Sequence, residues 1–264
     1  MRKVIISVAP VKAGTPVDAK KLAEDVEKCV KAGASMCHLH CRKPNGDLTA
    51  DISYMVECFE EILKRTDVVV QASTGGVSDL TIQERCNPLD YEKVETSSLN
   101  GGSTNLGENL YVNTFDDIRY CADYTYKKGI LPETEVFDIG MIHNMQIIRS
   151  EQPFKDPMLF NLVFGHKGGM QPTPEMFTAF RSFVPAGDLW GVTHFGRDNW
   201  TFLAQAISMG ATVVRVGFED SPYLAPGVDA EYNYQIVEKL TALIRAMGLD
   251  VATPEEAREI LKLK

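Results

Sequence analysis

The residues best suited to chemistry in this chain are two histidines, His38 and His40, one residue apart at the end of an apolar run. If residues 35–40 form a strand, both side chains point to the same face, because alternate residues of a strand do so. Paired imidazoles fill a core poorly, since each ring has polar nitrogens that need partners, but they bind zinc well. The pair therefore predicts a metal site, with a hydrogen-bonded histidine pair at a strand end as the alternative.

Two cysteines flank these histidines and compete with them as candidate ligands, because thiolates also bind soft metals. In an extended strand Cys37 faces away from His38. Cys41 has the same wrong parity, unless the strand has already ended there. We therefore expect neither thiol to bind the metal.

A second signal lies near residue 217, where Arg215, Gly217 and Glu219 share parity in another apolar run. Glu219 follows the end of that run and can supply a carboxylate oxygen. Two histidines and a glutamate with one open position form a catalytic zinc arrangement. The alternative for the Glu219-Asp220 pair is a helix N-cap or a solvated turn. Asp220 would pair with Arg215 as an acid/base or orienting couple.

Three further polar segments follow expected strands. Residues 73–76, Ser-Thr-Gly-Gly, offer a hydroxyl and bare backbone N–H groups that can hold a carboxylate or oxyanion, although an ordinary turn explains them equally well. Residues 100–102, Asn-Gly-Gly, have the same two interpretations. His194 is either a ligand or substrate contact or a structural histidine at a strand end.

Eight apolar, β-branched runs alternate with helical patterns along the chain, which predicts eight parallel strands covered by helices. We expect a single-domain (β/α)8 TIM barrel over residues 1–264, with a doubly wound open sheet as the second choice. No GxGxxG follows the first strand, and no phosphate-binding loop with Lys-Ser/Thr occurs. The expected strands are 4–9, 35–40, 68–73, 94–99, 135–139, 159–164, 189–193 and 212–217. The expected helices are 16–32, 51–65, 115–128, 141–150, 173–183, 198–209, 230–247 and 254–262.

Composition narrows the range of partners and compartments. The 264 residues have a net charge of −9, which argues against nucleic acid and anionic membranes as partners. The first residues read directly as a strand rather than a signal peptide, and no apolar run is long enough to span a bilayer. The six cysteines include no CxxC pair, so we expect free thiols and a cytoplasmic location.

Together these motifs resemble the β-keto acid cleavage enzymes over essentially the full chain. The segments that carry the resemblance are 4–10 (VIISVAP), 38–42 (HLHCR), 71–76 (QASTGG), 98–103 (SLNGGS), 132–136 (PETEV), 168–170 (GGM), 215–220 (RVGFED) and 252–261 (ATPEEAREIL). The resemblance implies a TIM barrel with one divalent metal, usually zinc, in a homotetramer. It also implies an acyltransferase that converts a β-keto acid and acetyl-CoA into acetoacetate and a new acyl-CoA.

The resemblance also implies roles for individual residues. His38, His40 and Glu219 would bind the metal, and Arg215 and Asp220 would form the catalytic dyad. The substrate would be bound by Ser73, Gly75, Gly76, Ser98 and Asn100. Ser73 would also take part in catalysis.

One position departs from the family pattern. Members that act on an amino-bearing substrate have a glutamate shortly after the first strand, where this chain has Gly14. A cationic substrate would lose its counter-charge there, so we expect a β-keto acid with a neutral or otherwise different tail; Lys12 would favour an anionic one.

The same residues allow two alternatives to this activity: a metal-dependent aldolase or other lyase on the same fold, and a metal-binding ligand sensor without turnover. The position of the histidine pair after the second strand disfavours the first. The Arg215-Asp220 couple disfavours the second, since a sensor needs no proton-transfer pair.

Overall fold

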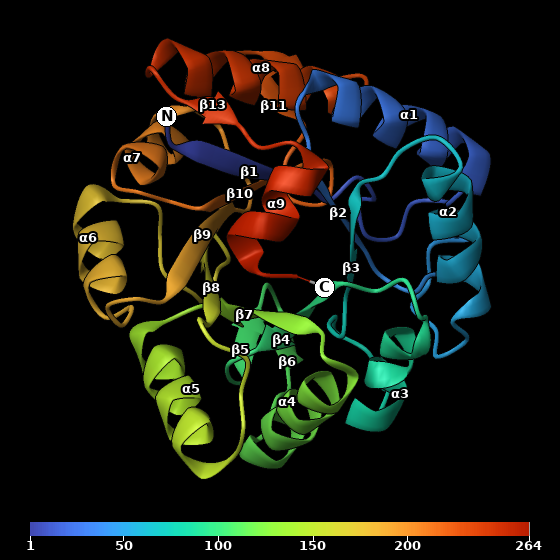
Figure 1. Cartoon of the computed structure of the whole chain (residues 1–264), viewed down its shortest axis with the longest axis vertical. Helices are drawn as coiled ribbons and strands as arrows, with labels where there is room; N and C mark the ends of the chain where they lie inside the picture. Colours follow the sequence, from blue (N-terminus) through green and yellow to red (C-terminus); the bar gives the residue numbers. More distant parts are fainter. Residues whose placement is uncertain (264) are drawn as a thin grey trace.

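Eight parallel strands close into a barrel in the computed structural model, which describes residues 1–263 (Figure 1). These strands are β1 (Lys3–Val8), β2 (Met36–Leu39), β3 (Val69–Ala72), β4 (Thr96–Asn100), β7 (Leu131–Val136), β8 (Leu159–Phe164), β9 (Leu189–His194) and β10 (Val213–Val216). Neighbours in the barrel follow chain order, and parallel pairing of β10 with β1 closes it. The architecture confirms the predicted (β/α)8 barrel.

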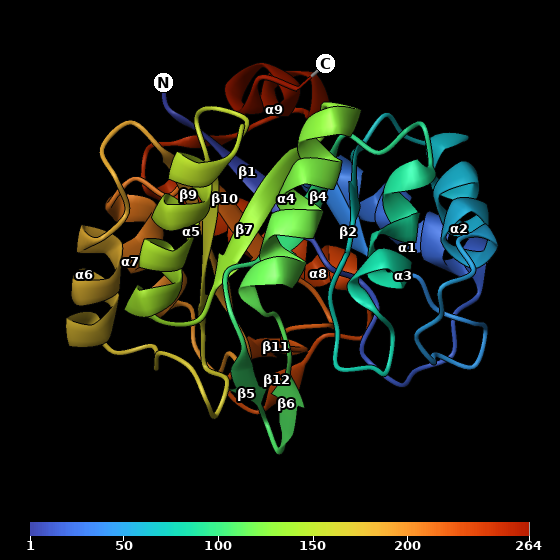
Figure 2. The same ribbon diagram turned by 90° about the horizontal axis from the view of Figure 1, so that it is seen from below.

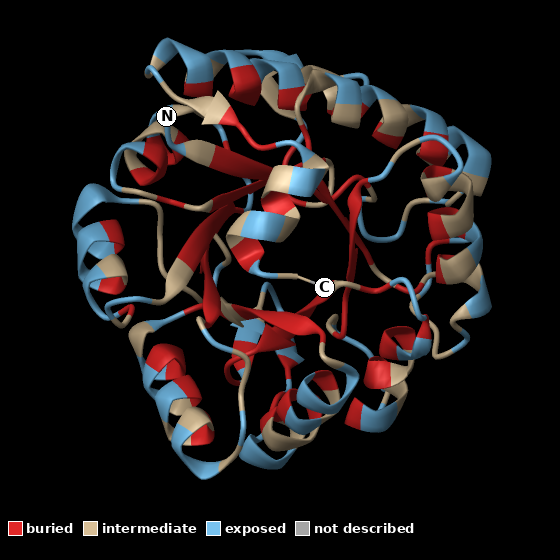
Figure 3. Cartoon of the chain, viewed as in Figure 1, coloured by how far each residue is buried: buried red, intermediate tan, exposed pale blue. Residues whose placement is uncertain are grey.

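Helices surround the barrel, and their apolar faces pack against the outer side of the strands (Figures 1 and 3). They are α1 (Ala19–Ala32), α2 (Ser53–Leu63), α3 (Ile82–Cys86), α4 (Phe115–Lys128), α5 (Ile139–Glu151), α6 (Pro174–Ser182), α7 (Thr201–Ser208), α8 (Asn233–Ala246) and α9 (Pro254–Leu261). Helix α1 illustrates the local rules: the Asp18 side chain caps its first turn, and Gly33 ends it with a positive φ of 121°. It therefore begins three residues later than the predicted start at Pro16.

The interior of the barrel is layered. Its floor is apolar and is closed by Ala257 and Leu261 of α9; the strand residues of this floor are Ile5, Met36, Val69, Leu131, Leu159, Leu189 and Val213. Above the floor the inward positions become polar, and the buried side chains there are those of Ser7, Gln71, Glu133, Asn161 and Arg215. The polar groups are thus confined to the carboxyl ends of the strands, where parallel barrels place their active sites.

The fifth barrel strand is the clearest error of sequence reasoning. We expected it at 135–139, but β7 spans Leu131–Val136, and Asp138 caps α5 by accepting a hydrogen bond from the Met141 amide at 3.1 Å. Pro132 and the acidic residues of this strand hid its pattern, because proline and glutamate are both uncommon in strands. The earlier start turns Glu133 and Glu135 into the barrel, in register with Ser98 and Asn100.

Several short elements were not predicted. Two hairpins lie on the side of the barrel opposite α9 (Figure 2). They are β5–β6 (Thr104–Leu106 and Asn109–Tyr111) and β11–β12 (Tyr223–Ala225 and Val228–Asp229). A short 3-10 helix, η1 (Asn87–Asp90), follows α3, and β13 (Asp250–Val251) pairs with β1 outside the barrel. The hairpins lengthen the loops around the carboxyl end, where the candidate site lies.

The six cysteines are free and buried. Cys37 and Cys41 pack in the apolar core between strands and helices, which agrees with the predicted orientation of Cys37 away from His38. Within residues 1–263 no helix has the length and apolar character needed to cross a membrane.

Candidate metal and catalytic site

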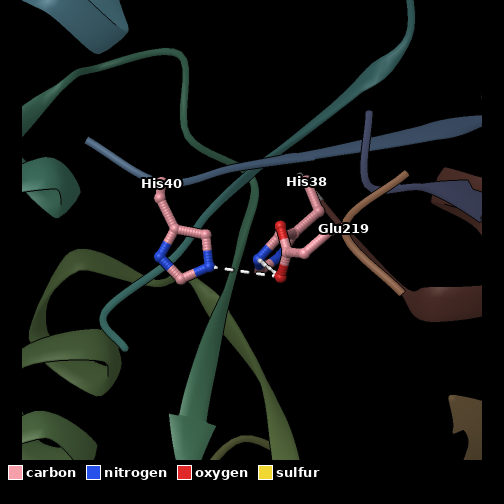
Figure 4. Close-up of side chains that lie close together, drawn as sticks. All are labelled: His38, His40 and Glu219. Carbon is pink, nitrogen blue, oxygen red and sulfur yellow. Dashed lines mark hydrogen bonds and ion pairs between the residues drawn. The ribbon is translucent and has the colours of Figure 1, made fainter. Parts of the chain in front are cut away.

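Three side chains from the two ends of the chain meet at the carboxyl end of the barrel (Figure 4). His38 belongs to β2, His40 follows that strand directly, and Glu219 follows β10. His40 Nε2 lies 3.3 Å from Glu219 Oε1, and His38 Nε2 lies 3.8 Å from the same oxygen. Because β1 is the common neighbour of β2 and β10, closure of the barrel brings these residues together.

The parity of Glu219 predicts that it belongs to an extended strand. In the structure, a turn after the strand brings Glu219 to the histidines instead. Strand β10 ends at Val216, and Gly217 has a φ of 138°, a conformation that favours glycine. A Cβ at Gly217 would lie 2.3 Å from the Ala9 carbonyl oxygen. The Glu219 amide donates to that same carbonyl at 3.1 Å, so the turn is held over the end of β1.

The arrangement fits a cation. His40 Nδ1 lies 3.1 Å from the Gly75 carbonyl, which can only accept a hydrogen bond, so Nδ1 carries a proton and Nε2 is the nitrogen turned toward Glu219. His38 Nε2 is buried and has no hydrogen-bond partner within the described residues. Burial lowers the pKa of His38 to about 3, which keeps this ring neutral. Two imidazole nitrogens and a carboxylate oxygen are a donor set typical of zinc and related divalent ions.

A buried arginine adjoins this cluster. Arg215 is 7% exposed and contacts three carboxylates. Its Nε and Nη2 donate to the two oxygens of Asp220 at 3.0 and 2.8 Å, a bidentate pair. Its Nη2 also lies 2.8 Å from Glu219 Oε1, and its Nη1 lies 3.3 Å from Glu135 Oε1. The structure therefore brings the predicted couple of Arg215 and Asp220 together, beside the candidate metal ligands.

The three carboxylates titrate differently because their surroundings differ. Burial raises the pKa of Asp220, against the attraction of Arg215. Burial also raises the pKa of Glu135, to about 7. Burial acts in the same direction on Glu219, but Arg215 and the two histidines outweigh it and hold its pKa well below 4.5. Glu219 is thus ionised, while Asp220 and Glu135 bind protons more readily than ordinary carboxylates.

A cavity of about 580 Å³ opens onto this cluster. Its wall includes His40, Glu135, Arg215, Glu219 and Asp220, and it extends past Gly14. The remaining wall is mixed, with apolar or aromatic residues and with charged ones; these are Leu48, Leu106, Phe137, Val163, Phe195, Arg42, Asp47 and Asp79. The cavity has the size of a small-molecule site.

The predicted substrate-binding residues fall into two groups. Gly75 and Gly76 line the cavity, whereas Ser73, Ser98 and Asn100 are buried behind its wall. The Gly75 amide donates to Ser73 Oγ at 3.1 Å, and the Thr74 amide donates to Ser98 Oγ at 3.0 Å. The two hydroxyls lie 3.3 Å apart, so they brace the glycine turn from behind. Asn100 accepts a hydrogen bond from the Gly102 amide at 3.2 Å.

Other residues near the site had no role in the sequence analysis. Glu135 was expected on the fifth strand but without a role in the site, although two glutamates at alternate positions of a barrel strand are a readable signal. His166 also lines the cavity, and its ring stacks on Phe195 with centroids 4.0 Å apart. His194, in contrast, packs edge-on against Phe202 of α7 with its centroid 4.9 Å away, an arrangement that favours the structural interpretation.

Comparisons with known proteins find relatives over nearly the whole chain. The family model described as beta-keto acid cleavage enzyme matches residues 3–263. The 3-keto-5-aminohexanoate cleavage enzyme of Fusobacterium nucleatum is 36% identical over 251 residues, which cover 94% of this chain and 91% of that protein. The 3,5-dioxohexanoate:acetyl-CoA acetone transferase of Paraburkholderia graminis is 32% identical and is matched over 100% of this chain and 96% of its own length.

Solved structures support the fold alone. A binary complex of ObcA with oxaloacetate superposes with a TM-score of 0.76 at 18% identity, covering 94% of this chain and 67% of the ObcA chain. The likeness extends the evidence for a barrel but carries no statement about the reaction.

Proposed function

The chain belongs to the β-keto acid cleavage enzyme family, and from this premise we propose that it exchanges acyl groups between a β-keto acid and acetyl-CoA. Its curated relatives are named as cleavage enzymes and acetyl-CoA-dependent transferases of such acids. In the proposed reaction R–CO–CH₂–COO⁻ and CH₃–CO–S–CoA give R–CO–S–CoA and acetoacetate. The observation that supports it best is the bidentate Arg215–Asp220 pair, which lies on the wall of the same cavity as His40 and Glu219, two of the three donors that could hold a metal.

His38, His40 and Glu219 would hold a divalent metal, for which we propose zinc. When bound, such an ion polarises the keto group and neutralises the carboxylate of a chelating β-keto acid. Its presence and identity can be tested by elemental analysis of the purified protein. His38→Ala should then abolish the bound metal, and full occupancy in that variant would contradict the ligand assignment.

Asp220 is the proposed base that removes the α-proton of the β-keto acid. Its raised pKa makes the carboxylate a better proton acceptor than an ordinary aspartate. Arg215 holds both Asp220 oxygens, so it fixes the direction of the carboxylate. Glu135 also contacts the Arg215 guanidinium, so the charge of Glu135 changes how strongly Arg215 attracts Asp220.

The carboxylate of the substrate is proposed to lie against the Gly75-Gly76 wall. Both glycines line the cavity, and a Cβ at either one would collide with the side chain of Tyr111 or Leu48, so this part of the wall has room only for glycine. Ser73 and Ser98 hold this turn in place through their contacts with the Gly75 and Thr74 amides, and Asn100 supports the neighbouring loop. These three residues would therefore act on binding mainly through the shape of the wall.

We propose a substrate with a neutral tail. Gly14 lines the cavity and nothing lies within 4 Å of a Cβ built there, so this position supplies neither a side chain nor a counter-charge. Steady-state assays should show higher kcat/KM for neutral β-keto acids than for 3-keto-5-aminohexanoate. Gly14→Glu should raise the relative kcat/KM for the amino-bearing acid, with Gly14→Gln as the uncharged control. A preference of the unmodified protein for the amino-bearing acid would overturn this proposal.

The activity itself is tested by incubating metal-loaded protein with acetyl-CoA and a panel of β-keto acids. We expect acetoacetate and the matching acyl-CoA to form together, and only when both substrates are present. Consumption of the β-keto acid without acetyl-CoA would indicate a simple lyase instead. A complete lack of turnover across the panel, with metal bound, would favour a ligand sensor.

A further inference from the structure

Two buried polar residues beneath the site have no role in the proposed chemistry: Gln71 of β3 and Glu133 of β7. Gln71 is fully buried and Glu133 is 2% exposed. Buried polar groups destabilise a fold unless they are hydrogen-bonded, so their partners are informative. Gln71 Nε2 donates to Glu133 Oε2 at 2.5 Å, and Gln71 Oε1 lies 2.8 Å from His38 Nδ1. A chain of side chains from three strands thus leads from the barrel interior to the metal-binding donors.

The direction of this chain follows from the chemistry of its members. Glu133 Oε2 accepts a hydrogen bond from Gln71 Nε2, so the NH₂ end of the Gln71 amide faces Glu133. The carbonyl end of that amide must then face His38. Because the amide carbonyl also only accepts, the proton of the neutral His38 ring must be on Nδ1, and the lone pair is left on Nε2. Nε2 is the nitrogen that points toward Glu219, 3.8 Å away.

We propose that Glu133 and Gln71 are positioning residues that set the tautomer of His38, so that its Nε2 lone pair is ready to bind the metal. This inference rests on the metal site proposed above. It adds a role for two residues that neither line the cavity nor belong to the three grouped donors. Groups that hydrogen-bond to metal-binding histidines orient the ring and strengthen metal binding.

The two histidines differ in how they are held. His40 Nδ1 is opposite the Gly75 carbonyl, a backbone group that has no alternative orientation. His38 is opposite a side-chain amide, which can rotate and present its NH₂ group instead. In that orientation Gln71 would favour a proton on Nε2 and block the metal-binding nitrogen. Glu133 is the group that prevents this rotation, since a turned amide would face it with a carbonyl oxygen.

The test uses Glu133→Gln, which keeps the size of the side chain but removes the acceptor-only partner. In the metal-free protein, nitrogen NMR of the imidazole rings should show His38 as the Nδ1–H tautomer in the wild type and as a mixture in the variant. The His38 signals are identified by their absence in His38→Asn. Metal affinity, measured by competition with a chelator, should fall by about 10- to 100-fold in Glu133→Gln.

Two further variants separate this role from general stability. Thr96→Val removes another buried hydrogen bond, to the Leu131 carbonyl at 2.7 Å, at the same depth of the barrel, and should leave both readouts unchanged. The double variant Gln71→Leu/Glu133→Leu removes the whole chain without leaving an unpaired charge, and should show the same tautomer mixture and weaker metal binding. It replaces Glu133→Gln if that variant does not fold.

The outcomes distinguish the two proposals. A His38 that stays in the Nδ1–H form in both altered proteins overturns the positioning role, whatever happens to metal affinity. If the tautomer shifts as expected but the wild-type protein binds no divalent metal, the positioning role stands and the metal site fails. Equal metal affinity in wild type and both variants, despite a shifted tautomer, overturns the link between tautomer and binding.

Discussion

At the residue scale, the charges around Arg215 explain why the site is suited to a divalent ion. One guanidinium contacts three carboxylates, those of Glu135, Glu219 and Asp220. When all three are ionised, the group carries two uncompensated negative charges in a largely buried place, which is unfavourable. A divalent cation between Glu219 and the histidines would balance them. Protonation of Glu135 or Asp220 relieves the same excess, which agrees with the raised pKa of both groups.

The first prediction concerns Asp220. Asp220→Asn keeps the shape of the side chain but removes the proposed base, so kcat should fall by about 10²- to 10⁴-fold. Metal content should stay unchanged, because Asp220 is not one of the three grouped donors. The measurement is steady-state turnover together with elemental analysis. Asp198→Asn, an exposed aspartate on a neighbouring loop, is the control; activity near the wild-type level in Asp220→Asn would remove Asp220 from the mechanism.

The second prediction uses the pH dependence of stability in metal-free protein. Glu135 has a pKa of about 7 when folded and an ordinary value of 4.5 when unfolded, so between these pH values the folded state holds the extra proton. Stability should therefore fall as pH rises from 4.5 to 7 and level off above 7, by on the order of 3 kcal/mol from this group.

Comparison with Glu135→Gln isolates the contribution of Glu135 from that of other titrating groups. Denaturant unfolding of both proteins in chelator, at pH 5 and pH 7.5, gives the free energies of unfolding. The free energy of unfolding of the wild type, relative to that of the variant, should be lower at pH 7.5 than at pH 5. A difference that does not change with pH would show that Glu135 titrates at its ordinary value.

At the element scale, the strand runs were predictable because buried parallel strands are apolar along their length. Strand β8 was expected at 159–164, where it is found, and β10 was expected at 212–217 against an observed Val213–Val216. Strand β7 broke the rule, since its inward positions hold Glu133 and Glu135 and its second residue is Pro132. The polar residues that bring this strand into the site also hid its apolar pattern in the sequence.

The site was predictable where a residue lies on a strand and less so where a turn places it. His38 and His40 share a face as strand parity requires, and they lie beside Glu219 as expected. The route of Glu219 through the Gly217 turn depends on contact with Ala9, more than two hundred residues earlier, which no local pattern reveals. Likewise, the burial of Ser73 and Ser98 behind the glycine turn depends on packing between β3 and β4.

The third prediction concerns helix α9, which closes the apolar floor of the barrel. Leu261 is 1% exposed and packs against the starts of the strands. Leu261→Ala should lower the free energy of unfolding by about 2–5 kcal/mol, the usual range for such a truncation. Turnover at a temperature where the variant is folded should be unchanged, since the polar layer separates this floor from the cavity. Glu259→Ala, on the exposed side of α9, should leave stability unchanged; an equal loss there would refute a specific role for Leu261.

At the scale of the whole molecule, the three donors of the candidate metal site come from the early and the late strands of the barrel. His38 lies on β2, His40 directly follows it, and Glu219 lies in the loop after β10, on the other side of β1. A metal held by all three would bind the closed barrel but not the unfolded chain. Such binding stabilises the folded state in proportion to the logarithm of the free metal concentration.

The fourth prediction follows from this linkage. Removal of the metal with a chelator should lower the melting temperature, and adding zinc at 100 times its Kd should restore about 2.7 kcal/mol. The measurement is thermal or denaturant unfolding across a series of free zinc concentrations. His38→Ala should show no such dependence. A zinc-dependent shift of equal size in His38→Ala would place the stabilising ion elsewhere.

The separation of these donors along the chain also affects when the protein can acquire its ion. Glu219 follows His40 by 179 residues, so a ribosome working at 5–20 residues per second needs roughly 10 to 35 s to add it. During that interval the nascent protein has the two histidines without the carboxylate or the closed barrel. A metal that needs all three donors would therefore bind only after Glu219 has been added, and a truncated product that ends before Glu219 would lack the complete donor set.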